Sequence, residues 1–213
     1  MDILDIHTHH PVPQPQGVVA LCAHPERGIP PLVGSQRYSV GIHPWDTIAE
    51  PDEAMWQDIE KTASRPEVVA IGESGVDLTP RGGPLFRQLQ IFKRHIDLSE
   101  RLRKPMIIHD VKGHDVIIGC RRDLKPKQNW VIHGFRRKAS VAVMLLRAGC
   151  WLSFGSEFNP DALRATPENR ILAETDESPM TIEEVIIRLS AAYGKDLTPV
   201  IAENSRIFLG NQL

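Results

Sequence analysis

Short apolar runs recur along the chain, and eight of them have the length and composition of buried β-strands. They lie near residues 3–7, 18–23, 38–43, 68–73, 106–109, 129–133, 151–155 and 171–175. Three other stretches, which begin at Leu85, at Ile182 and near residue 198, instead repeat apolar residues at helical spacing. The second of these follows Thr181 and carries Glu184, the pairing of a capping box, so we expect a helix to begin there.

This alternation of strands and helices predicts an α/β fold with a parallel sheet. Eight parallel strands in 213 residues fit one TIM (β/α)8-type barrel of small size, so we expect a single domain over residues 1–213. The connections at 10–16 and 24–37 are rich in Pro and Gly and show no helical stripe. Because parallel strands usually need a long crossover, we expect the barrel to lack one or two outer helices there, or its second strand to be short and irregular. The run Pro11–Pro15 fits a stiff active-site loop or a plain connection equally well.

Composition narrows the function classes only slightly. Hydrophobic residues make up 41% and charged residues 24%, as in ordinary globular proteins, and the net charge of −2 is not that of a strong nonspecific nucleic-acid binder. The cysteines Cys22, Cys120 and Cys150 are widely spaced, which argues against a thiolate zinc site and against a disulfide framework. We expect a cytoplasmic protein with no signal peptide and no membrane span.

Six potential metal ligands stand at the ends of five predicted strands: His7, His9, Glu73, His109, His133 and Asp176. One such residue alone is more often structural than a ligand. In a barrel of parallel strands, however, all carboxyl ends open on one face, where active sites are built. Four imidazoles and two carboxylates that converge there can hold two divalent cations.

The spacing of these residues indicates how they could divide between two cations. His7 and His9 are two residues apart and point to the same side of an extended chain, so one cation can bind both. Glu73 can bridge two cations through its two oxygens. His109 and His133 follow neighbouring strands and can complete the second site.

Asp176 can bind the first cation and hold the attacking water. The ligands offer nitrogen and oxygen, which suits Zn, Mn, Fe or Ni better than Ca, and Mg stays among the candidates. Such a site predicts metal-assisted hydrolysis.

Six segments resemble motifs of the TatD family in their order: Ile6–His9, Gly41–Pro44, Ile71–Asp77, Ile108–His109, Ile132–Phe135 and Glu174–Pro179. The closing run Glu203–Phe208 resembles the family's ending, so the resemblance covers nearly the whole chain. TatD proteins are metal-dependent hydrolases, generally described as deoxyribonucleases, with amidohydrolase-like TIM barrels. The resemblance thus implies this fold and a deoxyribonuclease-like activity.

The resemblance also implies roles for individual residues. It implies two ligand sets that share a bridging Glu73: His7, His9, Glu73 and Asp176 for one metal, and Glu73, His109 and His133 for the other. Asp176 would be the general base or orient the water. His43 matches a family histidine near the substrate phosphate, although it could instead be structural.

The chain departs from the family pattern on the loops around this site. The family's Ser-Arg after the histidine at 109 is Asp110-Val111 here, and its Ser-Gly after the phenylalanine at 135 is Arg136-Arg137. Arg136, Arg137 and Lys138 could contact phosphates, but a solvated helix start is the commoner role of such a cluster. Trp45 replaces the last residue of the family's His-Pro-His and could stack a base or cover the barrel mouth.

These observations leave three hypotheses, of which the first is a metal-dependent phosphodiesterase acting on DNA, at single-stranded ends. The second is a hydrolase of another ester or amide on the same metal site, such as a small cyclic substrate. The third is a noncatalytic metal-binding or scaffold protein, against which the complete set of six ligands argues. A DNA enzyme needs basic or amide donors leading away from the metals, whereas a small-molecule enzyme needs a closed pocket.

Overall fold

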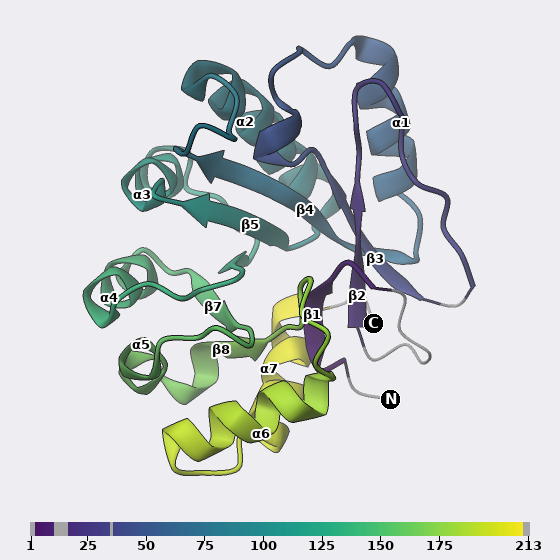
Figure 1. Ribbon diagram of the computed structural model, residues 1–213. Coiled ribbons are helices and arrows are strands. Elements are labelled where there is room, and N and C mark those ends of the chain that lie inside the picture. Colours follow the sequence, from purple (N-terminus) through teal and green to yellow (C-terminus); the bar gives the residue numbers. More distant parts are fainter. Residues whose placement is uncertain (1–2, 11–16, 35, 211–213) are drawn as a thin grey trace.

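Eight parallel strands form a closed barrel in the computed structural model, which describes residues 3–10, 17–34 and 36–210. The strands are β1 (Asp5–Thr8), β2 (Gly17–Cys22), β3 (Arg37–Gly41), β4 (Val68–Asp77), β5 (Met106–Val111), β6 (Trp130–Ile132), β7 (Trp151–Phe154) and β8 (Ile171–Ala173). They pair in chain order, and β1 pairs with β8 to close the ring. The predicted TIM-type barrel is therefore confirmed (Figure 1).

Helices follow most of the strands and lie outside them (Figure 1). They are α1 (Glu53–Ala63), α2 (Leu85–Leu102), α3 (His114–Leu124), α4 (Ala139–Arg147), α5 (Pro160–Ala165), α6 (Ile182–Tyr193) and α7 (Thr198–Leu209), with short 3-10 helices η1 (Pro44–Asp46) and η2 (Glu168–Arg170). The three predicted helices correspond to α2, α6 and α7. The capping box of α6 is present, because the Thr181 hydroxyl accepts from Glu184 N and the Glu184 carboxylate accepts from Thr181 N.

The connection from β2 to β3 has no helix within its described residues, 23–34 and 36. It contains a tight turn in which His24 and Gly28 exchange two backbone hydrogen bonds of 3.0 and 2.8 Å. β2 itself is regular, with five consecutive residues paired to β3. A missing outer helix, and not an irregular second strand, therefore accounts for the Pro- and Gly-rich sequence here. The run Pro11–Pro15 lies outside the described residues.

Two apolar clusters hold the fold together, one between strands and helices and one within the barrel. The inner cluster joins residues of opposite strands, such as Ile6 and Ile107, which can meet only inside the ring. Phe208 at the end of α7 belongs to it and contacts the Trp151 ring edge-on at 5.9 Å. Asn204 also anchors α7, because its amide donates to the carbonyls of Glu168 and Ile171 at 2.7 Å each. The amino end of the barrel is thus closed by α7.

Because α7 covers the amino end of the barrel, the carboxyl end is the one that stays open for polar residues.

Within the described part of the chain, no helix has both the length and the apolar character that crossing a bilayer requires.

Candidate metal centre

Glu73 on β4 is the centre of a polar cluster at the carboxyl end of the barrel, and it is 2% exposed. The glycines Gly72 and Gly75 allow β4 to approach β5 closely at this point. A Cβ atom on Gly72 would lie 2.2 Å from the Ile107 carbonyl oxygen, and one on Gly75 would lie 2.1 Å from that of His109. The Gly-Glu-Ser-Gly sequence therefore brings Glu73 next to the end of β5, which carries His109.

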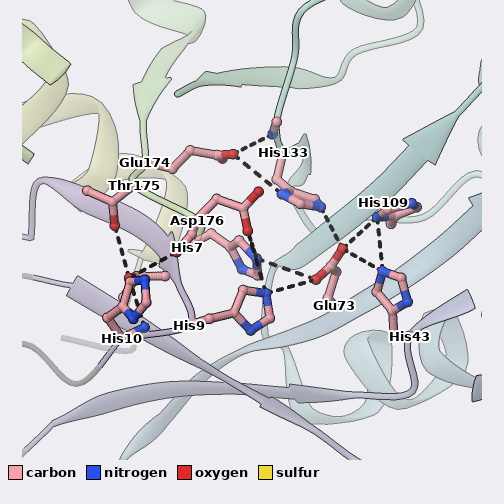
Figure 2. Close-up of polar contacts among 12 residues, drawn as sticks. His7, His9, His10, His43, Glu73, His109, His133, Glu174, Thr175 and Asp176 are labelled. Carbon is pink, nitrogen blue, oxygen red and sulfur yellow. Dashed lines mark hydrogen bonds and ion pairs between the residues drawn. The ribbon is translucent and has the colours of Figure 1, made fainter. Parts of the chain in front are cut away.

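One oxygen of Glu73, Oε1, faces three imidazoles. It lies 2.6 Å from His109 Nδ1, 2.7 Å from His133 Nε2 and 3.2 Å from His43 Nε2. His43 Nε2 is also 3.2 Å from His109 Nδ1. Figure 2 shows these rings grouped on one side of the carboxylate.

The other oxygen, Oε2, faces His7 of β1 and His9, which directly follows that strand. It lies 3.4 Å from His7 Nε2 and 3.6 Å from His9 Nε2 (Figure 2). Asp176 Oδ1 completes this side at 3.7 and 3.5 Å from the same two nitrogens. The structure therefore brings all six predicted ligands together, in two groups that share Glu73.

The donor atoms fit divalent cations on two grounds. On the side of His7 and His9, the donor separations of 3.4 to 3.7 Å resemble the distance of about 3.4 Å between ligand atoms in a tetrahedral zinc site with ordinary Zn–N bonds. His7 is fully buried, and within the described part of the chain neither of its ring nitrogens has a hydrogen-bond partner. Buried polar groups without partners are costly, and a cation at this position would supply the partner.

Asp176 follows β8 and is held at the rim by the backbone of β1. Its N–H donates to the His7 carbonyl at 3.0 Å, and its own carbonyl accepts from His9 N at 3.1 Å. Its φ of 54° lies in the left-handed region, which Asp tolerates better than most residues. The side chain is 40% exposed, so water can reach this carboxylate while β1 fixes its position.

The electrostatics of the cluster favour charge on its ligands. Burial alone would raise the pKa of Glu73, but the imidazoles around it, His133 foremost, hold that pKa well below its usual value. Burial opposes a charge on His133, yet Glu73 and Glu174 hold its pKa well above the ordinary range. Hydrogen bonds to the Cys22 sulfur and to Glu73 raise the pKa of His9 to about 10, against the effect of burial. Because cation and proton compete for the same lone pairs, metal binding displaces these protons.

Two carboxylates that the sequence analysis did not single out orient the histidines from behind. Asp77 Oδ2 lies 3.4 Å from His109 Nε2, and it accepts from the Trp45 indole N–H at 2.7 Å. Glu174 Oε1 lies 3.4 Å from His133 Nδ1. Partners of this kind commonly fix the ring orientation of metal-binding histidines. Their position in the sequence could have indicated them, since each is a carboxylate at a strand end beside a predicted ligand.

A third missed carboxylate, Asp5, lies behind the segment that carries Asp176. It accepts from the Thr175 hydroxyl at 2.6 Å and from Thr175 N at 3.0 Å. Burial raises its pKa to about 7, although the bonds from Thr175 oppose this. Asp5 therefore ties β1 to the end of β8 within the protein interior.

The predicted substrate residues have different surroundings. His43 is 9% exposed and belongs to the cluster, whereas Trp45 is 41% exposed. The Arg136 guanidinium pairs at 2.5 Å with the carboxylate of Glu157, which lies on the loop after β7. Arg137 is half-buried. Lys138 directly precedes α4, as expected of a solvated helix start.

A parallel barrel with His, Glu and Asp clustered at its carboxyl end is typical of metal-dependent hydrolases. The family described as TatD related DNase matches residues 34–206, so the chain belongs to that family.

The chain is 31% identical over 148 residues to YcfH of Escherichia coli K12, which is described as an uncharacterised metal-dependent hydrolase; the match covers 65% of this chain and 54% of the relative. It is 28% identical over 127 residues to the putative deoxyribonuclease tatdn3 of Danio rerio, covering 55% and 47%. The chain thus spans about half the length of the curated relatives it matches.

Solved structures agree with the fold. The crystal structure of YjjV, a TatD homolog from Escherichia coli, superposes with a TM-score of 0.79 over 96% of both chains at 18% identity. A dihydroorotase superposes with a TM-score of 0.62 at 12% identity, covering 98% of this chain and 69% of that one.

Proposed function

We propose that this protein is a phosphodiesterase that hydrolyses DNA, preferentially at single-stranded ends, with two divalent cations bound at the carboxyl end of the barrel. The observation that carries the proposal is the position of Glu73. Its oxygens face two separate donor groups, His7 and His9 on one side and His109 and His133 on the other. A carboxylate that serves two sets of imidazoles in this way is well placed to bridge two metals.

The ligands of the first cation would be His7, His9, Glu73 and Asp176, and those of the second Glu73, His109 and His133. When bound, such a pair of cations polarises the attacked phosphoryl group and activates water at neutral pH. Nitrogen and oxygen donors of this kind accept Zn, Mn or Ni, and with less preference Mg.

We assign Asp176 as the base that accepts the proton of the attacking water. It is an exposed carboxylate on a fixed backbone, next to His7 and His9. As the water oxygen forms its bond to phosphorus, its proton passes to the Asp176 carboxylate, and the bond from phosphorus to one ester oxygen breaks. The freed oxygen then takes a proton from solvent. His43, which faces Glu73 and His109, would lie next to the phosphate.

Trp45 is the residue best placed to receive a nucleobase beside the metals. Asp77 fixes its indole through the 2.7 Å hydrogen bond, while 41% of the residue stays exposed. The guanidinium of Arg81 lies 5.1 Å from the ring centroid. A fixed aromatic ring beside a cation is the combination with which proteins stack single-stranded bases and hold their phosphates.

The decisive experiment measures metal content and hydrolysis of end-labelled single-stranded DNA on the same preparation. We expect two metals per chain, loss of hydrolysis when a chelator removes them, and recovery when Zn²⁺ or Mn²⁺ is returned. Small cyclic amides and a simple activated ester serve as comparison substrates. Turnover of these with no cleavage of DNA would replace the phosphodiesterase by the second hypothesis, and bound metal without turnover of any substrate would favour the noncatalytic one.

The basic residues after β6 allow a separate test of the substrate. If Arg136, Arg137 and Lys138 contact phosphates, replacing all three by Ala should weaken DNA binding and reduce the salt slope by about 0.7 per lost contact for a single strand. Metal content and hydrolysis of a small activated phosphodiester should not change, because neither needs contacts beyond the metals. Binding would be measured by fluorescence anisotropy over a range of salt concentrations.

A matched control removes three exposed basic residues at the opposite end of the barrel: Arg122 in the last turn of α3, and Lys125 and Lys127 between α3 and β6. This control should keep the wild-type salt slope. If both triple variants bind DNA with the wild-type affinity at every salt concentration, Arg136–Lys138 form only a solvated helix start.

A further inference from the structure

Cys22, the last residue of β2, lies beside the proposed first metal position. Its sulfur, a ring nitrogen of His9 and a carboxylate oxygen of Glu73 all lie within 4.8 Å of one another. The strand order explains this, because β1 and β2 are neighbours and Thr8 pairs with Val19, which brings the end of β2 alongside His9. Cys22 is a free, half-buried cysteine, whereas Cys120 and Cys150 are buried elsewhere.

A second observation at the same place also indicates a ligand. The His7 side chain is fully buried, and none of the described residues forms a hydrogen bond with either of its ring nitrogens. Its Nε2 atom points at Glu73, 3.4 Å from Oε2, so it is directed at the carboxylate that Cys22 also approaches. A metal ion between this buried imidazole and the carboxylate would satisfy the ring nitrogen that has no hydrogen bond, and the same ion can bind the sulfur as well.

We propose that Cys22 supplies a thiolate ligand to the metal ion held by His7 and His9, and that it makes this position selective for zinc. The inference rests on the proposed function, since it concerns the first of the two metal positions assigned there. Thiolate is a soft ligand that favours Zn²⁺, whereas Mg²⁺ and Mn²⁺ favour carboxylate, carbonyl and water oxygens. The second position has imidazole and carboxylate donors, so the two positions should differ in metal preference.

The widely spaced cysteines gave no sign of this arrangement. Thiolate zinc sites are usually recognised from paired cysteines at short spacing, and Cys22 has no such partner in the sequence. A single sulfur ligand among histidines becomes visible only when the ends of neighbouring strands are placed together.

The direct test is zinc X-ray absorption on the protein, loaded with one Zn²⁺ per chain after metal removal. We expect a sulfur scatterer at about 2.3 Å in the wild type. Cobalt loading should give a thiolate-to-cobalt charge-transfer band in the near ultraviolet. Cys22→Ser and Cys22→Ala should lose both signals, and the control Cys120→Ser should keep them. The Cys22 variants should also bind zinc at least about tenfold more weakly, by analogy with the loss of supporting metal-site residues, while their affinity for Mn²⁺ stays unchanged.

Alkylation provides a readout that does not depend on spectroscopy or on activity. Cys120 and Cys150 are buried in the native protein, so iodoacetamide should modify Cys22 first. Zn²⁺ should protect Cys22 from modification and Mg²⁺ should not, as followed by mass spectrometry of the peptides. Circular dichroism confirms that the variants are folded.

The outcomes separate this proposal from the function on which it rests. Two metals per chain and DNA hydrolysis, with no sulfur scatterer and no zinc protection, would overturn the role of Cys22 and leave the phosphodiesterase intact. A sulfur signal that survives Cys22→Ser would also overturn it. A wild-type protein that binds no metal at all would overturn both.

Discussion

Replacing Glu73 by Gln is expected to remove most of the metal from the second position and nearly all DNA hydrolysis, while the barrel stays folded. Glutamine has the shape of glutamate, but it has one oxygen and an NH₂ group that can only donate. It therefore cannot place one ligand oxygen on the side of His109 and another on the side of His7, as the two oxygens of Glu73 do. It also removes the negative charge that these imidazoles surround.

Metal content by elemental analysis, thermal unfolding and turnover on labelled DNA together check this prediction. The loss of metal affinity should be at least about 100-fold, since even residues that only support metal ligands commonly cost 10- to 100-fold. Glu183→Gln is the matched control, because Glu183 is an exposed carboxylate in the first turn of α6, outside the metal cluster. Unchanged metal stoichiometry and turnover in Glu73→Gln would rule out a bridged two-metal site.

Replacing Asp176 by Asn should reduce the rate far more than it reduces metal affinity. The amide keeps one oxygen that can bind a cation, but it cannot accept the proton of an attacking water. Removal of a general base typically costs about 10²–10⁴-fold in rate. The backbone should be undisturbed, because Asn also adopts the left-handed conformation in which Asp176 is held.

This prediction is checked by kcat at saturating metal, together with metal affinity for the same variant. Glu177→Gln, an exposed neighbour on the same loop, is the matched control and should retain wild-type kcat. A loss of less than tenfold in Asp176→Asn, with the metals still bound, would assign the base to another residue.

The local sequence pattern was sufficient to predict the barrel, because strand and helix periodicity are properties of short segments. The apolar runs that end in His7, Glu73 and His109 showed where strands lie, but β4 continues past Glu73 to Asp77 and β5 continues past His109 to Val111. Parallel order then placed all those ends on one face. That the described residues between β2 and β3 form no helix could also be predicted, since Pro and Gly there leave no helical stripe.

Distances between strand ends could not be predicted in this way, because they depend on register, on close strand approach and on loop paths. Gly72 and Gly75 let β4 come against β5, and this sets the 2.6 Å contact from Glu73 to His109. The partners Asp77 and Glu174 were visible as carboxylates, but their pairing with His109 and His133 required the folded barrel.

The contacts that loops and neighbouring strands make were visible only in the tertiary structure. The sequence shows no acidic partner close to Arg136, yet the loop after β7 brings Glu157 to it. Cys22 reads as an isolated thiol, yet the pairing of β1 with β2 brings it beside His9. The sequence by itself determined which residue types end each strand, through local periodicity. The closed ring decided which of them meet, because residues far apart in the chain become neighbours only when the barrel closes.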